Sequence, residues 1–165
     1  VRVYIVRHGE TEDNKLRIAA GHNAGELSEL GKVQAKCLGE RLRDEPIDFI
    51  FCSDLRRTTQ TLELIRQELG KELPTVLEPR LREKHAGSLE GKKLGISERM
   101  AKAAGVPLRC FRPPGGESWN DVAQRARGFM KEVLSLCSTS SLHQKSYGLL
   151  LVTHGGFIKE LVNSL

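Results

Sequence analysis

Long hydrophobic runs are missing from this sequence, and their absence excludes a membrane-spanning protein. No stretch reaches about 18 consecutive apolar residues, the length that a transmembrane helix needs. Residues 1–6 are mostly apolar, but this run is too short for a signal peptide and leads directly into charged sequence. We therefore expect a protein of the cytoplasm that has no membrane partner.

Cysteine is also scarce, and so are patterns that bind metals. The 4 cysteines lie far apart and form no CxxC pair, so we expect free thiols in a reducing compartment. No His/Cys cluster has zinc-like spacing, and no cluster of carboxylates suits magnesium. The sequence thus predicts that the protein uses neither a metal nor another cofactor.

Aromatic residues make up only 5% of the chain, and no platform for stacking bases is visible. The net charge of +5 suits anionic partners of any kind, so by itself it does not distinguish a phosphate ester from nucleic acid. Because a stacking platform is missing, we expect no nucleic-acid partner. Nothing in the sequence indicates an oligomeric state.

The remaining composition is that of an ordinary globular protein. The 165 residues, 39% hydrophobic and 28% charged, fit a single domain. Short apolar runs bounded by loop residues predict buried strands at 3–6, 49–52, 75–78 and 149–152.

Helical patterns separate the predicted strands. One longer helix is expected after the N-cap Ser28; it carries Val33, Cys37, Leu38 and Leu42 and stops at Pro46. A second is expected before Gly70, with Leu55, Thr58, Leu62, Ile65 and Leu69 on one face. A third is expected after the capping box of Ser118 and Asp121, with Val122, Ala126, Phe129 and Val133 buried. A short helix near 97–104, a flexible connector at 138–141 and a helix after Gly156 to the end complete the pattern. Alternating strands and helices predict an α/β fold, with a mostly parallel sheet flanked by helices on both faces.

Polar residues follow three of the predicted strands directly. Arg7 and His8 follow the first, Arg57 lies shortly after the second, and His154 follows the last. Open α/β sheets bind their ligands at the carboxyl ends of the strands. If the strands are parallel neighbours, these residues converge on one crevice.

Such a set of residues suits phosphoryl transfer without a metal. The planar guanidinium groups of Arg7 and Arg57 match phosphate oxygens bidentately and can neutralise their charge. A neutral imidazole at His8 can attack phosphorus, and a second imidazole at His154 can donate a hydrogen bond to the phosphoryl group. The leaving group also needs a proton, which a carboxyl group can supply.

Four segments together resemble, in order, the motifs of the histidine phosphatase superfamily, also called phosphoglycerate mutase-like. They are Arg7-His8-Gly9-Glu10-Thr11 with Asn14, Ser53 to Thr61, Leu81 to Gly87 followed by Glu90-Gly91, and Val152-Thr153-His154-Gly155-Gly156. The resemblance implies that a phosphohistidine forms on His8, that Glu83 is the general acid and that His154 is the second catalytic histidine. It further implies that the substrate phosphate is bound by Arg7, Thr11, Asn14, Gly21, Arg57 and Gly155.

Within the superfamily, Met100 to Ala104 and Pro113 to Ser118 are most similar to the TIGAR type of fructose-2,6-bisphosphatase. The likeness implies hydrolysis of a small phosphorylated metabolite, with fructose 2,6-bisphosphate first in line. It also implies that residues 1–165 form a single domain that lacks the C-terminal segment of the full family fold. Residues 21–27 and Ala86 depart from the usual pattern, which implies a different substrate rim.

Other interpretations stay open beside this one. A phosphoglycerate mutase or a broad-range phosphatase would use the same fold, and a non-enzymatic phosphate-binding module would keep it too. The presence of all the ionisable groups that phosphoryl transfer needs argues against a non-enzymatic module. Among the remaining residues, we expect His22, His85 and His143 in loops or at the surface, with His22 close to the pocket rim. Trp119 should pack at the start of its helix rather than contact a ligand.

Overall fold

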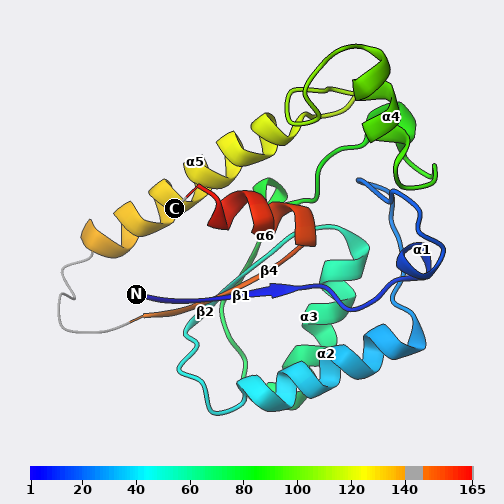
Figure 1. Cartoon of the computed structure of the whole chain (residues 1–165). Coiled ribbons are helices and arrows are strands. Elements are labelled where there is room, and N and C mark those ends of the chain that lie inside the picture. The colour runs from blue at the N-terminus through cyan, green and yellow to red at the C-terminus, as the bar shows by residue number, and fades with distance from the viewer. Residues whose placement is uncertain (140–146, 165) are drawn as a thin grey trace.

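The computed structural model describes residues 1–139 and 147–164, and it is built around one parallel sheet (Figure 1). The strands are β1 (Arg2–Arg7), β2 (Phe49–Cys52), β3 (Thr75–Leu77) and β4 (Gly148–Thr153), arranged in the order β1-β4-β2-β3. The helices are α1 (Glu12–Lys15), α2 (Glu29–Leu42), α3 (Arg56–Leu69), α4 (Ile96–Ala103), α5 (Trp119–Thr139) and α6 (Gly155–Val162), with short 3-10 helices at Pro79–Leu81 and Gly87–Leu89. All strand pairs are parallel, as predicted.

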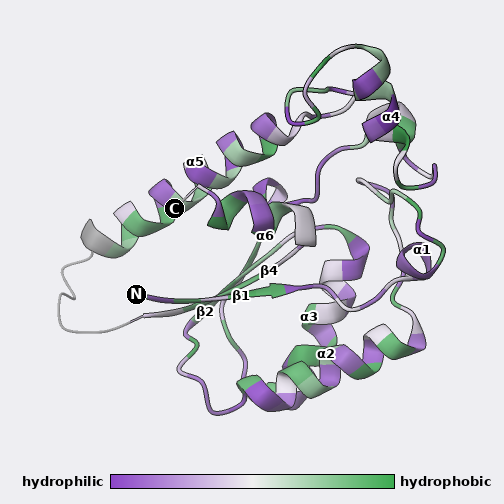
Figure 2. Cartoon of the chain, viewed as in Figure 1, coloured by the Kyte–Doolittle hydropathy of each residue, from purple (hydrophilic) through white to green (hydrophobic). Residues whose placement is uncertain are grey.

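Helices cover both faces of the sheet, which confirms the predicted α/β architecture (Figure 1). Successive residues of β4 point to opposite faces, as a strand requires. Leu149 and Leu151 pack with α5 and α6, whereas Leu150 and Val152 pack with α2 and α3. Figure 2 shows the helices alternating between hydrophobic and hydrophilic positions, as expected when one side of each faces the sheet.

Two helices agree closely with the sequence pattern. Helix α3 ends at Gly70, whose φ of 63° is the left-handed conformation that glycine adopts most readily. At the start of α5, Ser118 Oγ accepts from the Asp121 N–H at 3.2 Å and Asp121 Oδ2 accepts from the Ser118 N–H at 2.7 Å, which is the predicted capping box.

The packing face of α2 includes Leu38 and Leu42 from the sequence pattern, and it also includes small residues that the pattern did not single out. Val33 is 56% exposed and Cys37 is also exposed, whereas Gly31, Ala35 and Gly39 are buried. Small residues on this face allow the backbones of α2 and α3 to approach closely. Glycine and alanine give little hydrophobic signal, so the sequence pattern did not single them out.

The prediction of a connector at 138–141 is wrong for residues 138 and 139. Helix α5 continues through Ser138 and Thr139, while Ser140 and Ser141 lie outside the described residues. Adding one residue to an existing helix costs little, so two residues of modest helix propensity do not end it. The last helix, expected to run to the chain end, stops at Val162.

Strand register brings the polar residues to one edge. Arg7 pairs with Thr153, and Cys52 pairs with Val152, so β1, β2 and β4 end side by side. At this end an antiparallel bridge between Ile18 and Lys93 joins the loop after α1 to the segment before α4. Within residues 1–139 and 147–164, no helix is long and apolar enough to cross a membrane.

We expect Gly39→Ala to destabilise the protein by about 1–3 kcal/mol, although alanine is the better helix former. A Cβ at residue 39 would lie 2.7 Å from the Glu68 Cβ and 2.8 Å from the Ile65 carbonyl oxygen. Gly128→Ala in α5 is the matched control, because no atom lies within 4 Å of its added Cβ. That substitution should stabilise by up to about 1 kcal/mol in urea unfolding. Equal effects of the two substitutions would contradict the close contact of α2 with α3.

Candidate active site

A cavity of about 290 Å³ opens at the carboxyl ends of the strands, where the sequence placed the site. It is bounded on its other side by residues 93–98 around the start of α4. Six of the predicted site residues line it: Arg7, His8, Asn14, Gly21, Arg57 and Glu83. Thr11, His154 and Gly155 do not line it.

His8 is buried at the end of β1, and its backbone fixes the state of its ring. Nδ1 lies 2.7 Å from the Gly9 carbonyl oxygen, which can only accept, so Nδ1 carries the proton and Nε2 keeps a free lone pair. Burial lowers the pKa of His8 to about 4, and the nearby charges of Arg57 and Arg7 act in the same direction. The ring is therefore neutral near pH 7 and has the form that a nucleophile needs.

Close backbone packing beneath His8 requires glycine at position 9. A Cβ at this position would lie 2.3 Å from the Gly31 carbonyl oxygen in the first turn of α2. The Gly9 N–H donates to Thr61 Oγ1 of α3 at 3.1 Å. The loop that holds the histidine is thus anchored to both helices on that face of the sheet.

His154 lies beside His8, with ring centroids 5.2 Å apart. Burial, followed by the charge of Arg57, holds its pKa well below the usual range. Its Nε2 is 2.8 Å from Ser53 Oγ, while its buried Nδ1 has no hydrogen-bond partner among the described residues. When the Ser53 hydroxyl donates to Nε2, Nδ1 carries the proton and is available as a donor to a bound oxyanion.

Ser53 is a site residue that the sequence reasoning missed. It follows β2 directly, and its motif was recognised, but no role was assigned to the hydroxyl. The position at the end of a central strand was the available signal, because it matches that of His154 on β4.

Arg57 is 2% exposed and holds the loop that contains Gly21. Its guanidinium donates to the Asn23 carbonyl at 2.9 Å and to the Gly21 carbonyl at 2.8 Å, and no carboxylate of residues 1–139 or 147–164 is hydrogen-bonded to it. Burial lowers its pKa. No acidic residue offsets this cation in the first turn of α3, where the helix dipole is positive. The charges of Glu83, Asp13 and Glu90 nearby partly offset the cost of burying this cation.

Two further donors lie at the cavity wall. The Arg7 side chain lines the cavity and makes no hydrogen bond or ion pair with the described part of the chain, so its guanidinium can bind a ligand. Asn14 Oδ1 accepts from the Thr11 N–H at 3.1 Å, which leaves the amide Nδ2 as a donor. Thr11 is fully buried and its hydroxyl caps α1 by accepting from the Asn14 N–H. Direct contact between Thr11 and phosphate stays a prediction, as does contact by Gly155.

The Glu83 carboxyl is held by two backbone N–H groups. Oε1 accepts from Lys84 N–H at 2.8 Å and Oε2 accepts from Gly156 N–H, at the start of α6, at 2.9 Å. A Cβ at residue 156 would lie 2.2 Å from Glu83 Oε1, so the second glycine after His154 is needed for this approach. The carboxyl is thereby fixed at the edge of the cavity.

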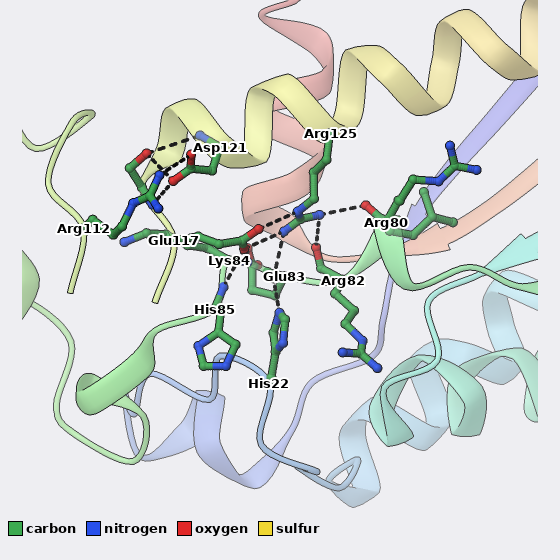
Figure 3. A network of polar contacts seen from close by, with 12 residues as sticks. His22, Arg80, Arg82, Glu83, Lys84, His85, Arg112, Glu117, Asp121 and Arg125 are labelled. Atoms are coloured by element: carbon green, nitrogen blue, oxygen red, sulfur yellow. Dashed lines mark hydrogen bonds and ion pairs between the residues drawn. The ribbon is translucent and has the colours of Figure 1, made fainter. Parts of the chain in front are cut away.

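Trp119 packs against the core at the start of α5, as predicted. Trp119 also lines the cavity, and Lys84, a lining residue that the sequence reasoning missed, places its Nζ 5.2 Å from the Trp119 ring centroid. His22 and His85 lie in loops, as predicted, and are partly buried, with ring centroids 4.4 Å apart; His143 lies outside the described residues. His22 Nε2 donates to the Glu83 carbonyl at 2.8 Å (Figure 3).

No group of three or more His, Cys, Asp or Glu side chains in residues 1–139 and 147–164 is placed to hold a metal ion. The positive groups that face the cavity are those of Arg7, Arg57, Lys84 and Lys93.

Comparisons with known proteins agree with this geometry. The profile of the Histidine phosphatase superfamily (branch 1) matches residues 3–165. A probable phosphoglycerate mutase GpmB of Erwinia tasmaniensis is 38% identical over 169 aligned positions that cover 100% of this chain and 74% of the relative. The crystal structure of phosphoglycerate mutase from Bacillus anthracis superposes with a TM-score of 0.84 at 25% identity, covering 99% of this chain and 78% of that one.

The fructose-2,6-bisphosphatase TIGAR of Bos taurus is also similar. It is 39% identical over 135 residues, which cover 80% of this chain and 50% of the relative. This chain therefore spans about half the length of that relative and about three quarters of GpmB.

We expect the His8 ring to remain neutral far below the usual histidine range. Two-dimensional ¹H–¹⁵N NMR of the imidazole groups should show a titration midpoint at about 4 and a proton on Nδ1. The unfolded chain takes up this proton first, so His8 should lower stability as the pH falls from about 6.5 towards 4. His8→Gln assigns the signal and should remove this part of the acid dependence. A midpoint near 6.5, or a proton on Nε2, would contradict the described geometry.

Proposed function

This chain belongs to the histidine phosphatase superfamily, and we propose that it hydrolyses a small phosphorylated metabolite, with fructose 2,6-bisphosphate as the first candidate. The observation that carries the proposal is the His8 ring, which is neutral, protonated on Nδ1 and placed in a cavity with two arginines and a carboxyl group. These are the parts that transfer of a phosphoryl group to histidine requires.

In the first step, the lone pair of His8 Nε2 attacks phosphorus in line with the ester oxygen. The N–P bond forms as the P–O bond to the leaving group breaks, and protonated Glu83 gives its proton to the departing alkoxide. Arg7, Arg57 and the Nδ1 proton of His154 neutralise the negative charge on the equatorial oxygens.

In the second step, water occupies the place of the leaving group. The Glu83 carboxylate takes a proton from this water as its oxygen attacks phosphorus. The N–P bond breaks, the electron pair returns to His8 Nε2, and inorganic phosphate leaves. Glu83 is protonated again, so the cycle closes without a co-reactant.

The cavity supports a small anionic substrate. Its volume of about 290 Å³ lies at the lower end of the roughly 300–1,000 Å³ of ligand pockets, which suits a metabolite better than a polymer. Lys84 and Lys93 line it beyond the catalytic groups, where a second phosphate could be bound. The 4 cysteines are unpaired, which fits our proposal of a cytoplasmic enzyme.

A mutase is the second candidate, because the likeness to GpmB covers the whole chain. A mutase returns the phosphoryl group to the same metabolite rather than to water. The two reactions share the first step and differ only in which hydroxyl enters afterwards. Assays of free phosphate and of phosphoglycerate isomers distinguish them directly.

We expect phosphate release from fructose 2,6-bisphosphate to exceed that from other sugar phosphates and phosphoglycerates. The measurement is kcat/KM over such a panel, and EDTA should leave the rates unchanged because the arginines supply the positive charge. Interconversion of phosphoglycerates without phosphate release would favour the mutase. A rate lost in EDTA and restored by a divalent ion would contradict the metal-free mechanism.

Glu83→Gln should separate substrates by their leaving groups. A sugar alkoxide needs a proton to depart, whereas nitrophenolate does not. Phosphoenzyme formation from a sugar phosphate should slow by about a hundredfold or more, and formation from p-nitrophenyl phosphate should change little. Rapid-quench measurement of both rates is the test. Equal slowing would mean that Glu83 holds the phosphate or the loop instead of supplying the proton.

A further inference from the structure

The segment that carries Glu83 has little regular structure of its own. It follows the 3-10 helix Pro79–Leu81, and Arg82 is extended, with a ψ of 157°. Backbone carbonyls in such a segment need partners from elsewhere, since buried carbonyl groups are rarely left unpaired.

Arg125 of α5 supplies those partners from more than forty positions away in the chain. Its NH1 donates to the carbonyls of Arg80 and Arg82, both at 2.7 Å, and its NH2 donates to the Glu83 carbonyl at 3.0 Å (Figure 3). One rigid planar group thus holds the backbone on both sides of Arg82 and at Glu83 itself.

Glu117 fixes Arg125 in turn. Its Oε1 accepts from Arg125 Nε at 2.9 Å and its Oε2 accepts from NH2 at 3.0 Å, so all five N–H groups of the guanidinium are engaged. Burial alone would raise the pKa of Glu117, but hydrogen bonds from Arg125 and from the His85 N–H lower it. The carboxylate is therefore ionised, and the pair is bidentate.

These two residues lie behind Glu83 and away from the substrate. Neither lines the cavity, and the Arg125 side chain is only 17% exposed. Arg125 also packs over the Phe157 ring at 5.5 Å, next to Gly156, whose N–H holds the Glu83 carboxyl. The main chain and the side chain of Glu83 are thus held by adjacent parts of one assembly.

We propose that Arg125 and Glu117 are positioning residues that hold the Glu83 carboxyl in line with the leaving-group oxygen. The inference rests on the role of Glu83 in the proposed function. Transition-state contacts depend steeply on placement, and a misplacement of about 1 Å can cost on the order of a hundredfold in rate. Loss of either residue should therefore impair proton transfer before it impairs substrate binding.

Arg125→Lys is the principal test, because lysine keeps the charge but cannot donate to five acceptors in one plane. Phosphoenzyme formation from a sugar phosphate should slow by about ten- to a hundredfold. The rate of phosphoenzyme formation from p-nitrophenyl phosphate should stay within about threefold of the parent, and KM should stay within about twofold. The reason is that the substitution affects proton transfer and not substrate binding. The same loss for both substrates would overturn the proposal.

Arg112→Lys is the matched control. Arg112 pairs with Asp121 at 2.6 Å near the same end of α5 but makes no hydrogen bond or ion pair with residues 80–83 (Figure 3). Its side chain is 63% exposed, and the substitution should change neither rate. Slowing by Arg112→Lys with the same dependence on the leaving group would assign the effect to general disturbance of α5 and overturn the proposal.

A double-mutant comparison tests whether Arg125 acts through Glu83. In the Glu83→Gln background, Arg125→Lys should slow phosphoenzyme formation from a sugar phosphate no further. If the two substitutions together slow the reaction by the product of their separate effects, Arg125 acts by another route.

Glu117→Gln, which keeps the side-chain shape, gives a second variant if Arg125→Lys does not fold, and the same selective loss is expected for it. Absence of phosphatase activity in the parent would instead refute the proposed function.

Discussion

The parallel pairing of β1 with β4 is the constraint on which the rest of the site depends. Because Arg7 pairs with Thr153, the residues that come next, His8 and His154, leave the sheet at the same point. Their rings lie 5.2 Å apart although 145 positions separate them in the sequence, and β2 brings Ser53 to the same edge. A shift of this register would separate the nucleophile from its partner, so the hydrophobic packing of β4 on both faces also determines the catalytic geometry.

Three ionisable groups of the site are oriented by the backbone. His8 donates to a carbonyl, Glu83 accepts from two N–H groups, and Arg57 donates to two carbonyls of the adjacent loop. Backbone partners cannot change their protonation near neutral pH, so they fix tautomers and orientations without adding competing charges. Such preorganisation is the form in which a site stabilises a developing charge most effectively.

Most helices and strands of the fold could be predicted from the sequence, because periodicity and capping are local properties. Helices α3 and α5 carry regular apolar faces and end or begin with recognisable caps, and the strands are short apolar runs. The glycine and alanine face of α2 was not predictable in this way, since close backbone packing leaves no hydrophobic signal. Arg125 was missed for a related reason: its acceptors are mostly carbonyls, and a carbonyl is present at every residue.

Trapping the phosphorylated enzyme tests the proposed chemistry most directly. After a rapid quench of Glu83→Gln with p-nitrophenyl phosphate, mass spectrometry should find an acid-labile, base-stable phosphate on the peptide that contains His8. The same treatment of His8→Ala should give no phosphopeptide and no turnover. Phosphate on any other residue, or turnover retained by His8→Ala, would contradict a mechanism that proceeds through His8.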